Sequence, residues 1–314
     1  MGTTPKIHSP NVAFFFQWMQ QLISDLDTSK QLKTAQSYRN CMKSFSLFCD
    51  STEAKHTSSR HLKLSQMTED LIVNYQRFLL SKKVCFNTIS FYMRILRAVY
   101  NKAVKSGLAE DRNLFSSVYT GVAKTEKRAV NADVIQQIKQ LDLSYNPTLA
   151  FSRDLFLLSF YFRGMAFVDL SHLKKTNVQN DFVRYTRSKT KQDLRIKIEP
   201  CAKEILQRYS CKKTDYLLPI LTSFENKLKN YDSALRLYNK HLSKLSQMTN
   251  LSFSLSSYVA RHSWATLAKK HGVGLMIISE SLGHNSLSTT QIYLDSLDQD
   301  RIDDANSLVI SLID

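Results

Sequence analysis

Apolar residues recur at the spacing of an α-helix through the first third of the chain. Between residues 12 and 116 they stand three and four positions apart, the interval at which one helix face repeats. This pattern predicts four helices, the first containing residues 12–23 and the others spanning residues 32–49, 67–81 and 87–107. Thr68 and Asn87 are suitable N-caps for the last two helices, and Gly107 is a suitable end for the fourth. The first part of the chain is therefore predicted to be a helical bundle.

The pattern changes after residue 117. Residues 118–130 are polar, basic and without periodicity, as in a linker. Residues 182–187 and 194–198 alternate between apolar and polar positions around a polar turn, which predicts a β-hairpin. The remaining segments predict helices near residues 133–141, 148–162, 231–247, 257–271 and 274–282, one starting at Pro200, and a tail helix after Asp298. We predict a mainly α protein with a helical domain at residues 1–117, a linker at 118–130 and an α-rich domain with a small β-hairpin at 131–314.

The charge of the chain indicates what kind of partner it binds. Its 43 Lys and Arg residues against 27 Asp and Glu give a net charge of +16, spread over both halves. Such a basic chain most often meets a polyanion, and nucleic acid is the first candidate. In the bundle, basic residues gather on single faces of the second and fourth predicted helices, and the candidates for DNA contact are Arg39, Lys43, Arg94, Arg97 and Lys102. The ordinary alternative is a solvated face, but two basic helices in one small domain favour phosphate contact.

Several classes of protein are excluded or disfavoured. The most apolar run, residues 155–162, is far shorter than the roughly 20 residues that cross a membrane. The N-terminal segment lacks the features of a signal peptide, so we expect a cytoplasmic, nucleoid-associated protein. The five cysteines are scattered without a C-x-x-C pair, and the eight histidines show no metal-ligand spacing. We therefore expect no metal and no cofactor.

Four features of the second half occur in a particular order. Arg187 and Lys189 lie at the turn of the hairpin, the stretch YVARHSWAT begins a helix, the stretch SLGH ends the next one, and Tyr293 follows. Alone, each has an ordinary explanation, such as a core tyrosine or a solvated lysine. Together with FYFRGMAFVDLSHLKKTNV, RYTRSKT and the nine residues from His284 to Tyr293, they resemble the tyrosine recombinases of the phage integrase family. The details are similar to the subgroup found on conjugative and mobilisable elements and among DNA invertases.

This resemblance implies a SAM-like core-binding domain and a catalytic domain with the tyrosine-recombinase fold. It also implies roles for individual residues. Tyr293 would attack the scissile phosphate of double-stranded DNA, forming a 3′-phosphotyrosine without metal or ATP. Arg261 would hold the phosphate oxygens, and His284 would donate a hydrogen bond to them. Lys189 would protonate the departing 5′-oxygen as general acid.

Two positions depart from the family's pattern. Ala166 stands where the family has its first arginine, and either Arg187 or Arg163 could replace it. We favour Arg187, because on a strand it shares a face with Lys189, two residues away; Arg163 could instead pair with Asp169. The second departure is Tyr258, where the family usually has histidine. A phenol is a poor base near pH 7, so a positional role is expected.

The leading interpretation is an enzyme of conservative site-specific recombination. The core-binding domain starts near residue 12, which leans toward DNA inversion, with integration and excision of a mobile element as the alternative. A type IB topoisomerase would use the same chemistry, and Ala166 and Tyr258 are the features that would fit a catalytically degenerate, architectural DNA-binding protein. The resemblance further suggests that the tail helix docks on a neighbouring protomer, which would link four copies into a ring on paired sites.

Overall fold

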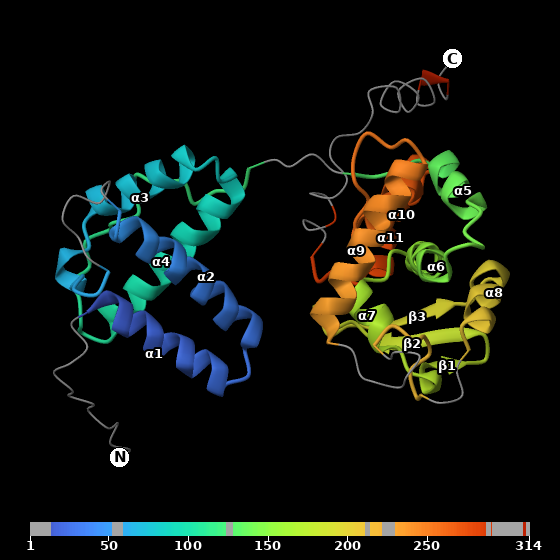
Figure 1. Ribbon diagram of the computed structural model, residues 1–314, viewed down its shortest axis with the longest axis horizontal. Helices are drawn as coiled ribbons and strands as arrows, with labels where there is room; N and C mark the ends of the chain where they lie inside the picture. The colour runs from blue at the N-terminus through green and yellow to red at the C-terminus, as the bar shows by residue number, and fades with distance from the viewer. Residues whose placement is uncertain are drawn as a thin grey trace. The chain divides into compact units, whose positions relative to one another are not determined.

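The computed structural model describes residues 14–51, 59–123, 128–210, 214–221, 230–286, 290 and 310–311. The chain divides into two compact units, Met1–Thr125 and Glu126–Asp314. Both are mainly helical (Figure 1). No helix in the described ranges is long and apolar enough to cross a membrane.

The first unit is a bundle of four helices, α1 (Phe15–Thr28), α2 (Leu32–Cys49), α3 (Glu69–Ser81) and α4 (Phe86–Lys105), with a short 3-10 turn, η2 (Leu64–Gln66), before α3. All four were predicted from the apolar spacing. Their inward faces form an aromatic core in which the rings of Phe45 and Tyr75 lie 4.9 Å apart, edge to face. The Tyr75 hydroxyl reaches Ser44 Oγ at 2.8 Å, so the buried phenol keeps a hydrogen bond. Packing of these apolar faces is what stabilises the bundle.

Of the three residues predicted to begin or end helices in this unit, two do so in the structure. Thr68 caps α3 by accepting a hydrogen bond from the backbone N–H of Leu71, and Gly107 follows α4 with a positive φ of 71°. Asn87 is not the N-cap of α4, because Cys85 holds that position. The Asn87 side chain instead pairs with the backbone of Ala123, donating to its carbonyl at 3.0 Å and accepting from its N–H at 2.8 Å. The Asn87 side chain therefore forms a long-range contact, although its local propensity favours a helix cap.

The second unit contains α5 (Ala132–Gln140), α6 (Pro147–Tyr161), α7 (Phe167–His172), the 3-10 turn η3 (Lys175–Asn177), β1 (Val178–Gln179), β2 (Phe182–Thr186), β3 (Asp193–Lys197), α8 (Pro200–Arg208), α9 (Tyr231–Met248), α10 (Val259–Lys270) and α11 (Leu275–Leu282). α6 packs against α5, α8, α9 and α10 (Figure 1). It is apolar on nearly every side, as a helix inside a core must be. The predicted tail helix lies outside the described residues except for residues 310–311.

The three strands form one antiparallel sheet in the order β1-β2-β3. In the predicted hairpin, Val183 pairs with Ile196 and Thr186 with Asp193. Val183 and Ile196 are buried while their neighbours along each strand are more exposed, so the sheet has one core face. The sequence did not predict β1 or α7, because two and six residues are too few to show a period.

Candidate active site

Two arginines converge on the carboxyl end of α11. The helix ends at Leu282, and Gly283 follows in the left-handed conformation with φ 63°. Arg261 Nη2 donates a hydrogen bond to the Leu282 carbonyl, and Arg187 Nη1 donates one to the Gly283 carbonyl. The last carbonyls of a helix lack helical partners and carry partial negative charge, so they attract guanidinium groups. Residues from the β2–β3 turn and from α10 thereby meet at one point.

Arg261 is held by backbone on two sides. It is 2% exposed, and its Nη1 donates to the Gly164 carbonyl at 2.9 Å. Gly164 lies between α6 and α7 with φ 73°, and a Cβ there would lie 2.6 Å from the Arg261 Cα. Only glycine permits both this backbone conformation and this close approach. The α6–α7 connection therefore packs directly against α10.

Arg187 stands at the start of the tight β2–β3 turn and is 3% exposed. Its N–H donates to the Gln192 carbonyl at 2.8 Å, which closes the turn. Two further contacts fix the turn from outside: Asp169 on α7 accepts from the Ser188 N–H at 2.9 Å, and Thr190 Oγ1 donates to the Gly283 carbonyl, also at 2.9 Å. The turn is thus attached both to α7 and to the end of α11.

His284 completes the group. Its Nε2 lies 3.0 Å from Arg261 Nη2, its Nδ1 lies 2.8 Å from Thr290 Oγ1, and the residue is 8% exposed. Burial lowers the pKa of the His284 imidazole to about 4, and the positive charges of Arg261, Arg187 and Lys189 contribute. The ring is therefore neutral at pH 7.

The arrangement is suited to hold an anion. The Nε atoms of Arg187 and Arg261 are buried, and neither has a hydrogen-bond partner among the described residues. Burial lowers the pKa of the Arg187 guanidinium, and Arg261 lowers it further, but arginine stays protonated in proteins. Within the described ranges no carboxylate forms an ion pair with either guanidinium. Two positive groups that lack a full negative partner would favour a phosphate between them.

Lys189 and Tyr258 lie beside this group. Lys189 is exposed on the β2–β3 turn, close enough that its charge contributes to the lowered pKa of His284. Tyr258 precedes α10 and is 38% exposed, with its ring 5.0 Å from that of His262 at an angle of 72°. Its phenol is near enough to Arg187 to affect the pKa of that guanidinium.

Arg163 is placed differently from the other candidates. It follows α6 in the left-handed conformation, with φ 56°, and is half-buried. Its side chain makes no hydrogen bond or ion pair with the described residues, so the pairing with Asp169 considered from the sequence is not seen there. Tyr293 lies outside the described residues.

Sequence reasoning missed Gly164 and Thr290 as site residues. A glycine between two helical segments, in a chain with 7 glycines, is a weak signal that the backbone needs a special conformation there. For Thr290 no comparable signal exists, because its importance comes from a contact with a ring six residues earlier in the chain.

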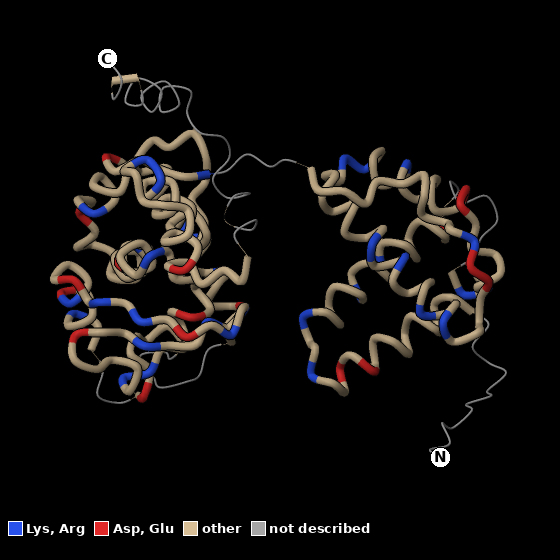
Figure 2. The backbone as a smooth tube through the Cα atoms, turned by 180° about the vertical axis from the view of Figure 1, so that it is seen from behind, with Lys and Arg blue, Asp and Glu red and all other residues tan. Residues whose placement is uncertain are grey.

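The candidate DNA contacts of the first unit occupy two helices. Arg94, Arg97 and Lys102 lie exposed on α4, opposite its buried residues, and Lys43 is exposed on α2. Arg39 is paired with Asp27 of α1. Lys and Arg are distributed along the backbone of both units (Figure 2).

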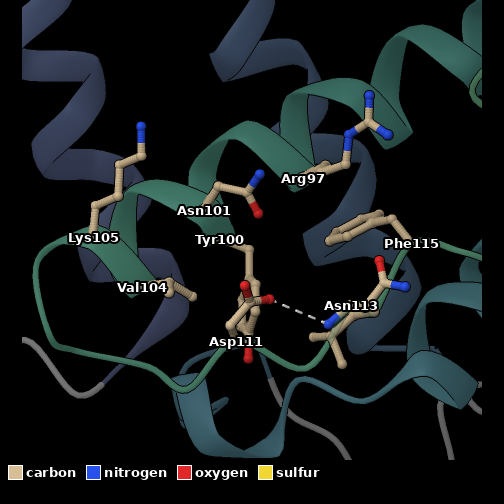
Figure 3. A pocket seen from close by; sticks show the side chains of 9 residues that line it. Arg97, Tyr100, Asn101, Val104, Lys105, Asp111, Asn113 and Phe115 are labelled. Atoms are coloured by element: carbon tan, nitrogen blue, oxygen red, sulfur yellow. Dashed lines mark hydrogen bonds between the residues drawn. The ribbon is translucent and has the colours of Figure 1, made fainter.

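A cavity of about 330 Å³ lies beside Arg97 in the first unit. Its wall combines α4 with the chain that follows, and the lining residues are Arg97, Tyr100, Asn101, Val104, Lys105, Asp111, Asn113, Leu114 and Phe115 (Figure 3). The Asp111 carboxylate shares the cavity with the two basic side chains. The cavity is therefore mixed in charge and does not by itself select an anion.

Comparisons with known proteins show the family of this chain. Residues 14–117 match the phage integrase SAM-like domain, and residues 128–300 match the phage integrase family. Tyrosine recombinase XerC of Rickettsia massiliae (strain Mtu5) is 26% identical over 292 residues, covering 90% of this chain and 91% of that protein. A tyrosine recombinase of Pseudothermotoga lettingae is 30% identical over 165 residues, which are 50% of this chain and 54% of that one.

Solved structures share the fold. A lambda integrase tetramer bound to a Holliday junction superposes with a TM-score of 0.68 at 16% identity, covering 94% of this chain and 82% of that one. The Tn1549 transposon integrase in complex with a circular intermediate DNA gives a TM-score of 0.68 at 13% identity, covering 96% and 99%. Since the family match spans more than half of its length, this chain belongs to the phage integrase family and is a tyrosine recombinase, an enzyme that breaks and rejoins DNA.

Proposed function

We propose that this enzyme recombines double-stranded DNA at specific sites through a covalent bond between Tyr293 and a 3′-phosphate. The observation that carries the proposal is the convergence of Arg187, Arg261 and His284 at the end of α11, with two buried guanidinium Nε atoms that lack partners in the described part of the chain. A phosphodiester in its transition state has extra negative charge on its equatorial oxygens. Guanidinium groups fixed beforehand stabilise that charge without having to reorganise.

The chemistry assigns one task to each residue. The Tyr293 oxygen attacks phosphorus, the bond from phosphorus to the 5′-oxygen breaks, and Lys189 gives a proton to the departing oxygen. An exposed lysine on a short turn suits this task, since its long side chain can reach the leaving group. Tyr258, at the start of α10, positions Arg187 and leaves the proton transfers to other groups.

The chain itself supports Tyr293 as the nucleophile. Thr290 is fully buried and contacts His284 at 2.8 Å. Three residues of extended chain span at most about 10 Å, so a residue three positions after Thr290 stays within reach of the arginine pair. A covalent phosphotyrosine conserves the energy of the broken bond, which is why rejoining would need no ATP.

Arg187 takes the place of the arginine that Ala166 does not supply. Arg187 and Arg261 donate to adjacent carbonyls at the end of α11, which supports this assignment. The Arg163 side chain makes no hydrogen bond or ion pair with the described residues. The exposed cations Lys43, Arg94, Arg97 and Lys102, together with Arg39, would contact phosphates of the same DNA in the first unit.

The enzyme would act as a tetramer on two paired sites, with the tail docked on the neighbouring copy. The lambda integrase neighbour, a tetramer on a Holliday junction, supports this assembly by its shared fold. Inversion of the DNA between two sites is the outcome that we favour. Integration and excision is the alternative, and the fold shared with the lambda and Tn1549 integrases supports it equally well.

The test is a nicked suicide substrate that carries a DNA site to which the protein binds. Wild-type protein is expected to form a protein–DNA adduct on a denaturing gel. Tyr293→Phe should bind the same duplex with nearly unchanged affinity, since the phenol supplies chemistry and not affinity, but form no adduct. Tyr145→Phe, which changes an exposed tyrosine in the same unit, is the matched control and should form adduct normally. An adduct with Tyr293→Phe would remove Tyr293 from the role, and binding without any adduct by the wild type would indicate an architectural protein.

A further inference from the structure

The two nitrogens of His284 have partners of different kinds. Nε2 lies 3.0 Å from Arg261 Nη2, and Nδ1 lies 2.8 Å from Thr290 Oγ1. A guanidinium has donors and no acceptor, so Nε2 can face it only with a lone pair. The proton of the neutral ring is then on Nδ1, and the Thr290 hydroxyl is the group that accepts it. Geometry alone thus selects one of the two tautomers.

Arg261 cannot turn aside to permit the other tautomer. Its Nη1 donates to the Gly164 carbonyl and its Nη2 to the Leu282 carbonyl, so the guanidinium is held from both ends. The other charged groups that affect the ring, Arg187 and Lys189 from the β2–β3 turn, are also positive and oppose a second proton. Thr290 is fully buried, so water does not compete for Nδ1.

We propose that Thr290 is a positioning residue that holds His284 in the Nδ1–H tautomer and so presents Nε2 as a hydrogen-bond acceptor. The inference deepens the proposed function and rests on it for its catalytic meaning. In this tautomer, donation from Nε2 to a phosphate oxygen requires a second proton on the ring, which the negative charge of a bound phosphodiester would favour. Thr290 precedes Tyr293 by three residues in the sequence, so the contact joins the proton position in His284 to a residue close in the chain to the proposed nucleophile.

The tautomer can be measured without any DNA. Long-range ¹H–¹⁵N spectra of histidine-labelled protein at pH 7.5 should show that His284 has a protonated Nδ1 and an unprotonated Nε2. The His284 signals are assigned by their loss in His284→Gln. Thr290→Val keeps the shape of the side chain but removes the acceptor, which leaves a buried Nδ1–H without a partner. Because Arg261 is fixed, we expect the ring to rotate away from it, and the single Nδ1–H form should be lost. Thr290→Ser should restore it. Thr190→Val is the matched control, because it removes a hydroxyl that bonds to the Gly283 carbonyl and not to the ring.

Single-turnover cleavage of the suicide substrate supplies the catalytic readout. Thr290→Val should cleave about ten- to a hundredfold more slowly with a shifted pH profile, and Thr290→Ser should stay within about threefold of the wild type. A wild-type ring protonated at Nε2, or an unchanged tautomer in Thr290→Val, would overturn the proposal. If Thr290→Val does not fold, the wild-type and Thr290→Ser spectra still decide. An absence of cleavage in the wild type would count against the proposed function and leave the spectra to judge Thr290.

Discussion

Arg187 and Arg163 are the side chains that could replace the arginine absent at Ala166, and they differ in how the fold holds them. Arg187 is buried against the end of α11, while Arg163 is half-buried in a left-handed backbone conformation. The resemblance to the phage integrase family placed Arg261 and His284 in one site, and the structure brings these two side chains together. The sequence could not choose between the other two arginines, because that choice depends on the shape of the β2–β3 turn, which Asp169 and Gly283 determine from distant parts of the chain.

Substituting these two arginines tests the assignment. Arg187→Ala should lower the single-turnover cleavage rate by about a hundredfold or more, the usual effect of losing a donor to the transition state. Arg163→Ala should cost less in rate and more in thermal stability. Cleavage rates and melting temperatures of both variants are the measurements. The opposite pattern, with cleavage lost in Arg163→Ala and kept in Arg187→Ala, would transfer the role to Arg163.

His284 should make stability depend on pH. Its pKa is about 4 in the folded protein and near 6.5 in an unfolded chain, so the folded state binds the proton less readily. Its contribution to stability is therefore complete above pH 6.5 and is lost as the pH falls toward 4. Between pH 7.5 and pH 5 the wild type should lose about 2 kcal/mol more unfolding free energy than His284→Gln.

Urea titrations at the two pH values measure this loss. The chain has two tryptophans, Trp18 and Trp264, one in each unit. In a Trp18→Phe background the fluorescence of Trp264 reports on the second unit alone. Equal losses in the wild type and in His284→Gln would show that the ring is not held neutral by its surroundings.

Among the elements of the second unit, the connection between α6 and α7 packs closely against α10. Gly164 and Gly107 share a left-handed φ, 73° and 71°, but only Gly164 has a neighbour within 4 Å of an added Cβ. Gly107→Ala should cost about 1 kcal/mol for the backbone conformation. Gly164→Ala should cost about 1–3 kcal/mol more, because the Cβ meets the Arg261 backbone, and it should lower cleavage as well.

Urea unfolding measures both substitutions, with Trp18 as the reporter for Gly107→Ala and Trp264 for Gly164→Ala. An equal loss of unfolding free energy in the two variants would mean that the α6–α7 connection can move away from Arg261 freely.

The longer helices of both units could be predicted because their apolar faces are long enough to repeat, whereas the six residues of α7 are too few. What the sequence could not show were contacts between distant segments. Asn87 has the properties of a helix cap, but its amide is used by Ala123, 36 residues later. Similarly, the N–H of Val130 donates to Ser263 Oγ at 2.9 Å, a partner 133 residues away. Ala123 and Val130 both lie in residues 118–130, the stretch that the sequence predicts to be a linker.

For the whole molecule, the tail after Asp298 provides the test of assembly. Apolar residues of the tail fall on one helical face in the sequence, which suits docking on a neighbouring protomer. Deleting residues 299–314 should spare binding to a single DNA site and abolish pairing of two sites. Gel-shift and sedimentation measurements would separate the two steps. Unfolding of the second unit, or loss of single-site binding, would instead show that the tail belongs to its own subunit's core.

The carbonyl groups at the end of α11 have a consequence for the free energy of the unbound protein. They orient Arg187 and Arg261 with partial charges, so two buried guanidinium groups lie close enough to repel each other, and the charge of Asp169 offsets this repulsion at Arg187 only in part. We expect the phosphate of a DNA substrate to relieve this repulsion by acting as a counterion to both groups. The second unit should therefore unfold at a higher temperature with DNA bound than without it.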